Sequence, residues 1–198
     1  MIQESFTNTR IYEIRWHGRG GQGAITAAKI VAQAAYLEGY QGVTAAPSFG
    51  AERRGAPVSA LTRISSTPVM VVSQVEKPDV VVVLDHTLLQ YREVTSGLGK
   101  DGWLVVNSRQ HPKDLSVKGD FNIATADATG ICWKLGLVIA GLTIVNTAML
   151  GAFVRATKVV DMASIDTVIR ERFPTNAIDT NLSAVTETCE ITKLEKIG

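Results

Sequence analysis

The chain has 198 residues, of which 45% are hydrophobic and 20% are charged, and its formal net charge is +1. This balance is typical of a globular protein with a real core and argues against a disordered chain. A net charge so close to zero also argues against a broad nucleic-acid-binding surface.

The beginning of the chain predicts a strand, a glycine-rich loop and a helix. Residues 11–16 (IYEIRW) alternate apolar and polar side chains, as a half-buried strand does. The loop HGRGGQG follows at 17–23, and apolar residues then recur at helical spacing from Ala24 until Gly39, a natural helix stop. A short strand at 43–46 leads to a second loop, PSFGAERRGAP, at 47–57.

The middle of the chain predicts mainly strands. Residues 58–64 and 69–75 have strand composition and are separated by four turn-forming residues, which predicts a hairpin. The β-branched run at 80–84 is typical of a strand buried on both faces. A helix at 87–94, a strand at 103–106 and a weaker strand at 121–126 continue the alternation.

The last third predicts helices. The longest apolar run, 135–145, falls well short of the roughly 20 residues that a membrane span needs, so we expect a buried segment and no span. Asn146 and Asp161 are expected to cap two helices, the second of which ends before Pro174. The tail from about residue 176 is also helix-like.

Strands that alternate with helices predict a three-layer α/β fold: a mostly parallel sheet with helices on both faces, an antiparallel hairpin and a helical C-terminal part. Residues 1–198 are expected to form a single domain with a helical tail at about 176–198, since no repeat or low-complexity linker divides them. A cytoplasmic location is expected, because no signal peptide is visible and Cys132 and Cys189 are not arranged as a disulfide framework.

The glycine-rich loop is the first candidate site. It fits G-x-G-x-x-G between a strand and a helix, where glycines let an anion approach the free N–H groups of the helix N-terminus. Arg19 adds a positive charge at the same place. The cofactor-binding residues expected in this loop are Gly18, Arg19, Gly20, Gly21, Gln22 and Gly23.

Three interpretations of this loop compete. An independent NAD site is disfavoured, because the second strand ends in TAAP at 44–47 and lacks the acid that holds the ribose. An anion or coenzyme contact remains open. So does a loop whose glycines serve only strand–helix packing or subunit docking.

The second candidate site is the loop at 47–57, which carries Arg53 and Arg54 between glycines and prolines. Guanidinium groups bind phosphate or carboxylate bidentately, so both arginines are expected to bind a cofactor. The alternative is a solvated loop whose charges keep the protein in solution.

Other motifs do not assemble into an active site. Asp85 and His86 follow the buried strand at the edge where parallel sheets bind ligands, but a helix-capping Asp is commoner than a catalytic pair. The histidines show no metal-ligand spacing, and two cysteines are too few for an iron–sulfur cluster. The nucleophile elbow, the Walker lysine and the GDG start of a thiamine diphosphate motif are absent. We therefore predict no catalytic and no metal-binding residue.

The two loops together carry a family resemblance. The stretch HGRGGQGAITAAKIVAQAA, followed by PSFGAERRGAPV, closely resembles the gamma subunit of pyruvate:ferredoxin and 2-oxoisovalerate:ferredoxin oxidoreductases. The stretches KPDVVVVLD, GWLVVN and NTAMLGA are also similar, so the resemblance covers about residues 12–173. HGRGGQG and ERRGAP favour the pyruvate and branched-chain enzymes over the 2-oxoglutarate enzymes.

The resemblance implies oxidative decarboxylation of a 2-oxoacid to an acyl-CoA, with pyruvate as the expected substrate and branched-chain or aryl 2-oxoacids left open. It implies that thiamine diphosphate, Mg²⁺ and iron–sulfur clusters belong to other subunits and that electrons pass to ferredoxin or another acceptor. The implied partners are catalytic alpha and beta subunits and a ferredoxin-like delta subunit. This chain, which alone binds no cofactor and is expected to be inactive, would then have a structural and coenzyme A-side role.

Two other functions remain as alternatives. A stand-alone Rossmann-like nucleotide-binding oxidoreductase is suggested by G-x-G-x-x-G, and titration with NAD tests it. A purely structural scaffold subunit has a glycine loop that touches only protein, and coenzyme A binding in the assembled complex distinguishes it from the leading hypothesis.

Overall fold

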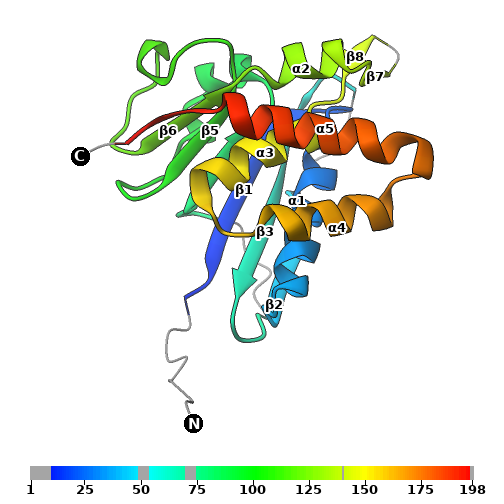
Figure 1. Cartoon of the computed structure of the whole chain (residues 1–198). Helices are drawn as coiled ribbons and strands as arrows, with labels where there is room; N and C mark the ends of the chain where they lie inside the picture. Colours follow the sequence, from blue (N-terminus) through cyan, green and yellow to red (C-terminus); the bar gives the residue numbers. More distant parts are fainter. Residues whose placement is uncertain (1–9, 49–53, 70–74, 140, 197–198) are drawn as a thin grey trace.

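The computed structural model describes residues 10–48, 54–69, 75–139 and 141–196 (Figure 1). Within these residues, seven strands form the main sheet in the order β2-β3-β1-β4-β5-β6-β9. Four neighbouring strands, β1, β4, β5 and β6, run parallel, whereas β3 is antiparallel to both β1 and β2, and β9 is antiparallel to β6. The strands are β1 (Tyr12–Arg19), β2 (Gly42–Pro47), β3 (Pro57–Ser65), β4 (Val80–Val83), β5 (Trp103–Asn107), β6 (Asn122–Ala126) and β9 (Lys193–Glu195).

The sheet has two buried faces of different character. Because strand side chains alternate, Val80 and Val82 of β4 face one layer, and Val81 and Val83 face the other. The first layer holds the larger core, in which the ring of Trp16 lies 5.5 Å from that of Phe153. A strand of four valines, all fully buried, fits this central position.

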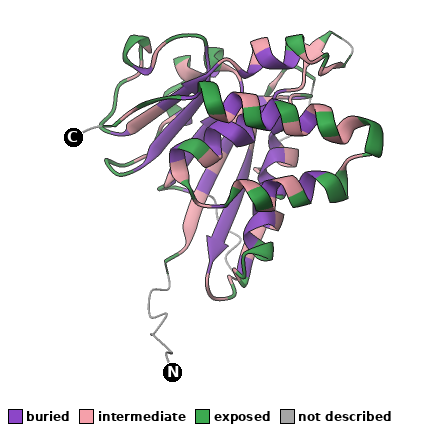
Figure 2. Ribbon diagram, viewed as in Figure 1, coloured by how far each residue is buried: buried purple, intermediate pink, exposed green. Residues whose placement is uncertain are grey.

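The α-helices in the described part of the chain all pack on the first layer, as Figures 1 and 2 show. They are α1 (Ala24–Leu37), α2 (Ala128–Lys134), α3 (Asn146–Thr157), α4 (Met162–Arg172) and α5 (Thr175–Ile191). The second face is covered by 3₁₀ turns and loops, including η1 (His86–Gln90), η2 (Arg92–Val94) and η3 (Pro112–Asp114). The predicted α/β class and mostly parallel sheet are confirmed, but the described α-helices lie on one face of the sheet, and 3₁₀ turns and loops take the place of helices on the other.

Two predicted elements differ in detail. The helix predicted at 87–94 is instead the two 3₁₀ turns η1 and η2, because Tyr91 between them is extended (φ −92°, ψ 122°) and stops helix propagation. The strand predicted at 58–64 lies within β3, which pairs with β1 and β2. Its predicted hairpin partner, 69–75, lies mostly outside the described residues. β2 and β3, which precede and follow the arginine loop in the chain, are antiparallel neighbours.

The prediction that the apolar run 135–145 is buried is wrong, because Val145 alone is buried among the described residues of the run. The run turns at Gly136 and Gly141, both with positive φ, and forms the small hairpin β7 (Val138–Ile139) and β8 (Leu142–Thr143). Ile139 is 67% exposed, because the two turns project the hairpin away from the main sheet. Near the C-terminus, α5 is followed by the short strand β9, which the sequence pattern did not predict.

Asp161 occupies the N-cap position of α4 as predicted, although its side chain makes no capping hydrogen bond. The described helices include none with the length and apolarity that crossing a membrane requires.

Candidate functional site

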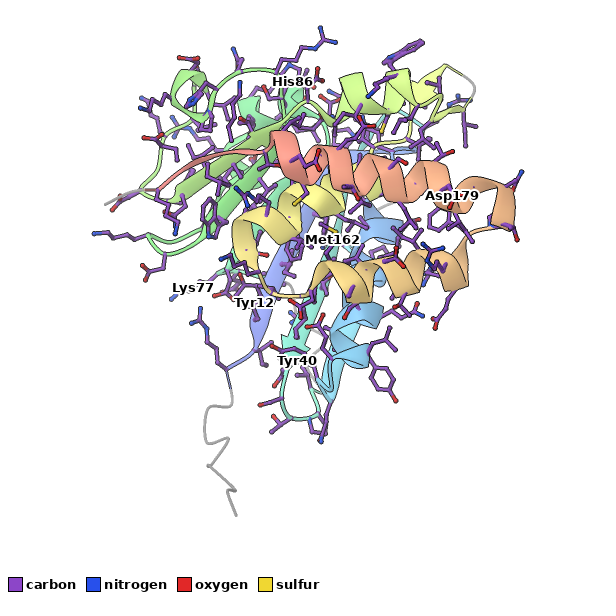
Figure 3. All side chains as sticks on the ribbon, in the orientation of Figure 1. Tyr12, Tyr40, Lys77, His86, Met162 and Asp179 are labelled. Atoms are coloured by element: carbon purple, nitrogen blue, oxygen red, sulfur yellow. The ribbon has the colours of Figure 1, made fainter. Side chains whose placement is uncertain are left out.

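The carboxyl ends of the parallel strands form one edge of the sheet, and the glycine loop lies there. β1 ends at Arg19, Asp85 follows β4, and β5 ends at Asn107. From β1 the chain passes to α1 on one face, whereas from β4 it passes to η1 on the other face. Ligands of open α/β sheets bind at such a divergence of connections. In Figure 3, His86 marks this edge, and Tyr12 lies at the opposite edge.

The backbone of the glycine loop requires glycine at two positions. Gly21 and Gly23 have φ angles of 98° and 84°, in the left-handed region that a side chain disfavours. Gly18 has a different constraint, since a Cβ there would lie 3.2 Å from Cδ1 of Leu84. The spacing of G-x-G-x-x-G is thus explained locally by one close approach and by the turn into α1.

Asn146 lies against the glycine loop, which the sequence pattern did not predict. A Cβ on Gly23 would come within 2.6 Å of its Nδ2, so the absent side chain leaves room for this amide. Asn146 is only 5% exposed, and its Oδ1 has no hydrogen-bond partner. The prediction that Asn146 caps α3 is wrong, because Val145 is the N-cap and Asn146 begins the helix. The N-termini of α1 and α3 therefore meet at this loop.

The N-terminus of α1 carries an uncompensated positive potential. Its N-cap, Gly23, makes no side-chain hydrogen bond to the first turn, and the first turn contains no acidic residue. The first N–H groups of a helix lack internal acceptors and favour a nearby anion. The glycine loop thus has the electrostatics that an anion contact needs, while such a contact remains a prediction.

The glycine loop and the arginine loop are joined by backbone hydrogen bonds. The Gly20 N–H donates to the carbonyl of Ala56 at 2.8 Å, and the Gly55 N–H donates to the carbonyl of Gly20 at 3.0 Å. Gly20 also forms a parallel bridge with Arg54, whose side chain is exposed. Arg53 lies outside the described residues. The glycine loop and the described end of the arginine loop, residues 54–57, therefore form one surface.

Arg19 binds three groups within the chain, and we call these residues the Arg19 cluster. Its Nε donates to the Asp85 carboxylate at 2.7 Å, Nη2 donates to Thr87 Oγ1 at 2.8 Å, and Nη1 donates to the Gly55 carbonyl at 3.1 Å. Its backbone N–H donates to Oε1 of Gln22 at 2.7 Å. The guanidinium thus links the ends of β1 and β4 with the arginine loop, and its charge is compensated within the chain.

Asp85 caps η1, as the sequence indicated. Its carboxylate accepts hydrogen bonds from the Thr87 N–H at 2.9 Å and from the Thr87 hydroxyl at 2.6 Å. Burial acts to raise the pKa of Asp85, but the hydrogen bonds from Thr87 and Arg19 outweigh it and hold the pKa below its ordinary value. His86 is exposed, and no hydrogen bond joins it to Asp85. The two residues therefore do not form a catalytic pair.

His17 precedes the glycine loop but lies inside the sheet. Burial, with a further contribution from the charge of Arg15, lowers the pKa of His17 to about 4. Its Nε2 is buried without a hydrogen-bond partner. His17 is therefore neutral near pH 7, and its place in the strand makes it a packing residue.

A cavity of about 440 Å³ opens beside the Arg19 cluster at the carboxyl edge. It shares Thr87 with the cluster, and hydroxyl, amide and leucine side chains dominate its lining. The lining residues are His86, Thr87, Leu89, Gln90, Gln110, Leu115 and Ser116. Its size falls in the range of small-ligand pockets, and it extends the candidate surface beyond the two loops.

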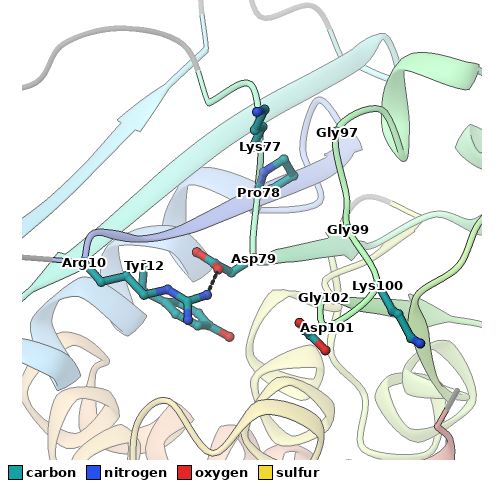
Figure 4. A pocket seen from close by; sticks show the side chains of 10 residues that line it. All are labelled: Arg10, Tyr12, Lys77, Pro78, Asp79, Gly97, Gly99, Lys100, Asp101 and Gly102. Carbon is teal, nitrogen blue, oxygen red and sulfur yellow. Dashed lines mark hydrogen bonds and ion pairs between the residues drawn. The ribbon is translucent and has the colours of Figure 1, made fainter. Parts of the chain in front are cut away.

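A second cavity, of about 270 Å³, lies at the opposite edge of the sheet (Figure 4). Its central carboxylate, Asp79, is occupied by Arg10 and by the N–H of Glu13 at 2.8 Å. Lys77 and Lys100 point away from it in Figure 4. This cavity has no contact with the glycine loop, so we do not assign it to the candidate site.

The comparisons with known proteins agree with one another. The family model described as "Pyruvate ferredoxin/flavodoxin oxidoreductase" matches residues 13–191. The chain is 45% identical to the "Pyruvate/ketoisovalerate oxidoreductases common subunit gamma" of Pyrococcus abyssi, over 93% of this chain and 99% of that one. It is 46% identical to the "Pyruvate synthase subunit PorC" of Methanosarcina barkeri, over 80% of this chain and 84% of the relative.

Solved structures show the same fold. The pyruvate oxidoreductase subunit PORC of Thermotoga maritima superimposes with a TM-score of 0.81 and 39% identity, covering 94% of this chain and 99% of that one. The 2-oxoglutarate:ferredoxin oxidoreductase of Magnetococcus marinus, described with 2-oxoglutarate, coenzyme A and succinyl-CoA bound, gives a TM-score of 0.71 at 17% identity. That match covers 93% of this chain and 31% of the longer chain, and at this identity it establishes the fold alone.

Proposed function

The chain belongs to the pyruvate ferredoxin/flavodoxin oxidoreductase family, and on that premise we propose that it is the gamma subunit of a multi-subunit 2-oxoacid:ferredoxin oxidoreductase. The complex would oxidise a 2-oxoacid, release carbon dioxide, transfer the acyl group to coenzyme A and pass two electrons to ferredoxin or another acceptor. Pyruvate is the first substrate to test, followed by 2-oxoisovalerate, because the similar subunits are named for these two acids.

The observation that carries this proposal is the joining of the glycine loop and the arginine loop on one surface. We propose that this surface faces the phosphate groups of coenzyme A, whose thiol accepts the acyl group when it is bound. Two features fit an anion: the N-terminus of α1, which no side chain caps, and the exposed side chain of Arg54. These residues would bind and orient the coenzyme without taking part in bond making.

The remaining cofactors are proposed to belong to the alpha, beta and delta subunits. The thiols of this chain do not fit an iron–sulfur cluster, which normally takes four thiolates. Cys132 is buried, and burial, with a smaller contribution from Asp127, raises its pKa to about 12; Cys189 is a separate free thiol.

Two free thiols support the proposed cytoplasmic location, where disulfides are rare. Residues 1–198 are proposed to act as a single domain.

The stand-alone nucleotide-binding oxidoreductase is not supported. In a dinucleotide-binding fold, a parallel second strand beside β1 places an acid at the ribose. Here the neighbour of β1 on that side is β3, which is antiparallel, and β2 lies beyond it and ends at Pro47 without an acid. A purely structural subunit remains the competing outcome of the experiment that follows.

The test is reconstitution of the complex with and without this chain. Coenzyme A-dependent oxidation of pyruvate and of 2-oxoisovalerate is measured for the complete complex, for the complex that lacks the chain and for the chain alone. The chain alone is expected to turn over neither substrate, and the complete complex at least one. Turnover by the isolated chain, or saturable NAD binding to it, would overturn the proposal. An unchanged Michaelis constant for coenzyme A after loss of the arginines would support a purely structural role.

A further inference from the structure

Asn146 is a buried polar residue that the packing of the fold does not explain. It begins α3, is 5% exposed, and its Oδ1 has no hydrogen-bond partner. Its neighbour Thr147 is also buried, but the Thr147 hydroxyl donates to Oδ1 of Asn181 at 2.7 Å. Buried polar groups in proteins almost always have a partner, so an unpaired one needs a separate reason. An apolar side chain of similar size would fill the position of Asn146 without burying an unpaired amide.

The amide of Asn146 lies where two helices begin. In α1, the carbonyl of the N-cap residue Gly23 accepts from the Ala27 N–H at 3.0 Å. In α3, the carbonyl of the N-cap residue Val145 accepts from the Met149 N–H at 2.9 Å. The three N–H groups that precede each of these donors have no acceptor within their own helix. Free backbone donors of both helices therefore accompany this side chain.

The junction of α1 and α3 has a positive potential that neither helix neutralises. Both helices are fully described, and neither has a side-chain cap or an acidic residue in its first turn. Each helix N-terminus is equivalent to about half a positive charge, so two of them approach one unit. Gly21 is exposed, which leaves this side of the glycine loop open to solvent. The junction is thus an accessible site for an anion.

The side chain of Asn146 presents a donor to this site. A Cβ on Gly23 would lie 2.6 Å from Nδ2, so the amide nitrogen, and not Oδ1, faces the start of α1. A phosphate group has several oxygens and can accept from a side-chain amide and from backbone N–H groups at the same time. The chemistry of the junction therefore fits a phosphate group.

We propose that the junction of α1 and α3 binds one phosphate group, which accepts hydrogen bonds from Nδ2 of Asn146 and from the first N–H groups of α1. This inference deepens the proposed function and rests on it, because it assigns a phosphate of coenzyme A to Asn146. It also gives a role to the sequence NTAMLGA, which begins at this residue and lies outside both candidate loops. The competing role is structural, with an amide that only fills the space beside Gly23.

The experiment titrates the isolated full chain with inorganic phosphate at constant ionic strength and follows the amide signals by NMR. We expect saturable shifts of the N–H groups at 24–26 and of the Asn146 side chain. Asn146→Asp should weaken binding about tenfold or more, because a carboxylate of the same shape replaces the donor with a repelling charge. A negative charge is favourable at a helix N-terminus, so this variant should melt within a few degrees of wild type.

Two further variants serve as controls. Asn146→Leu removes the amide without adding charge and should also lose phosphate binding, so it gives the comparison should Asn146→Asp unfold. Asn176 is exposed in the first turn of α5, which also lacks an acidic residue. Asn176→Asp therefore adds the same charge at another helix start and should bind phosphate within about twofold of wild type. Phosphate affinity within twofold of wild type in both Asn146 variants would overturn the proposal, as would equal shifts at the starts of α1 and α5.

The source of the phosphate group is tested in the assembled complex. There Asn146→Asp should raise the Michaelis constant for coenzyme A about tenfold or more and leave the subunit content unchanged. Lost phosphate binding with an unchanged Michaelis constant makes free phosphate the ligand and overturns the assignment to coenzyme A. A complex in which the wild-type chain supports no coenzyme A-dependent oxidation overturns the proposed function, whereas titration of the isolated chain still decides whether the junction binds phosphate.

Discussion

The Nε of Arg19 donates to the carboxylate of Asp85 over 2.7 Å and so ties the end of β1 to the end of β4. Their side chains are 31% and 17% exposed, so the pair is partly shielded from water. The same guanidinium reaches Thr87 and the Gly55 carbonyl. The charge that the sequence assigned to a ligand phosphate thus has three partners within the chain, and stability and ligand binding at Arg19 can be separated by experiment.

Arg19→Ala is expected to lower the free energy of unfolding by about 2 kcal/mol, the scale of hydrogen bonds to charged groups. The reason is that Asp85 loses its guanidinium partner while it stays partly buried. Arg19→Lys keeps the charge but cannot reproduce the planar fork, so we expect an intermediate loss. Urea denaturation of the isolated chain measures both.

The control for Arg19 is Arg92→Ala, which removes an exposed arginine and should change stability by less than about 0.5 kcal/mol. If Arg19→Ala matches this control in stability while the Michaelis constant for coenzyme A rises in the assembled complex, the guanidinium acts on the ligand. A stability loss with unchanged coenzyme kinetics assigns Arg19 to the fold.

Gly23→Ala is expected to destabilise the chain by about 3 kcal/mol. Its φ of 84° costs an alanine about 1–2 kcal/mol, and its new Cβ meets the Asn146 amide at 2.6 Å, which adds an overpacking cost of similar size. Gly39→Ala is the matched control, because its φ is 94° and nothing lies within 4 Å of the new Cβ. Chemical denaturation of both variants separates the dihedral cost from the clash.

The double variant Gly23→Ala/Asn146→Ala tests the packing contact directly. If the clash is real, shortening residue 146 relieves part of it, and the two changes cost about 1 kcal/mol less together than their sum. Simple additivity would show that Gly23 and Asn146 do not constrain each other. The total helix content, measured by circular dichroism, should be the same in the single and double variants as in wild type.

His17 gives a pH dependence. Its pKa is lowered from about 6.5 in the unfolded chain to about 4 in the fold, so protons bind the unfolded chain preferentially between these values. The contribution of neutral His17 to stability is therefore present above pH 6.5 and is lost as the pH falls towards 4. Denaturation midpoints across this range should fall less steeply for His17→Gln than for wild type. His86→Gln, at an exposed position, should follow the wild-type curve.

Several strands of the sheet could be predicted, because the pattern of apolar residues within each strand is enough to identify it. The alternation before the glycine loop and the valine run of β4 each specify a strand without help from distant residues. The small hairpin β7–β8 was missed, because an apolar run has no periodicity that separates a buried segment from an exposed one. The strand order could not be predicted from local patterns either, since the placement of β3 between β1 and β2 depends on long-range pairing.

The candidate site was predicted in part for the same reason. The glycine and arginine loops are local motifs, and their glycines and arginines led to the prediction that they bind an anion. Their contact through Gly20, Gly55 and Ala56 joins residues more than thirty positions apart, which spacing alone cannot give. Asp85 was correctly assigned to a helix cap, but its bond to Arg19 and the approach of Asn146 to Gly23 are tertiary facts.

The last prediction concerns the arginine loop. Replacing Arg53 and Arg54 together by alanine should raise the Michaelis constant for coenzyme A about ten- to a hundredfold in the assembled complex, since a lost charged hydrogen bond costs about 1.5–3 kcal/mol. Folding should be little affected, because Arg54 is exposed on a loop. The effect should shrink as salt is raised, because exposed charges are screened over about 10 Å at 0.1 M ionic strength. The measurement is the coenzyme A dependence of pyruvate oxidation at two salt concentrations, beside the melting temperature and the subunit content of the complex. A constant Michaelis constant with intact assembly would leave the two arginines as solubilising charges, and lost assembly with normal kinetics in the residual complex would assign them to docking.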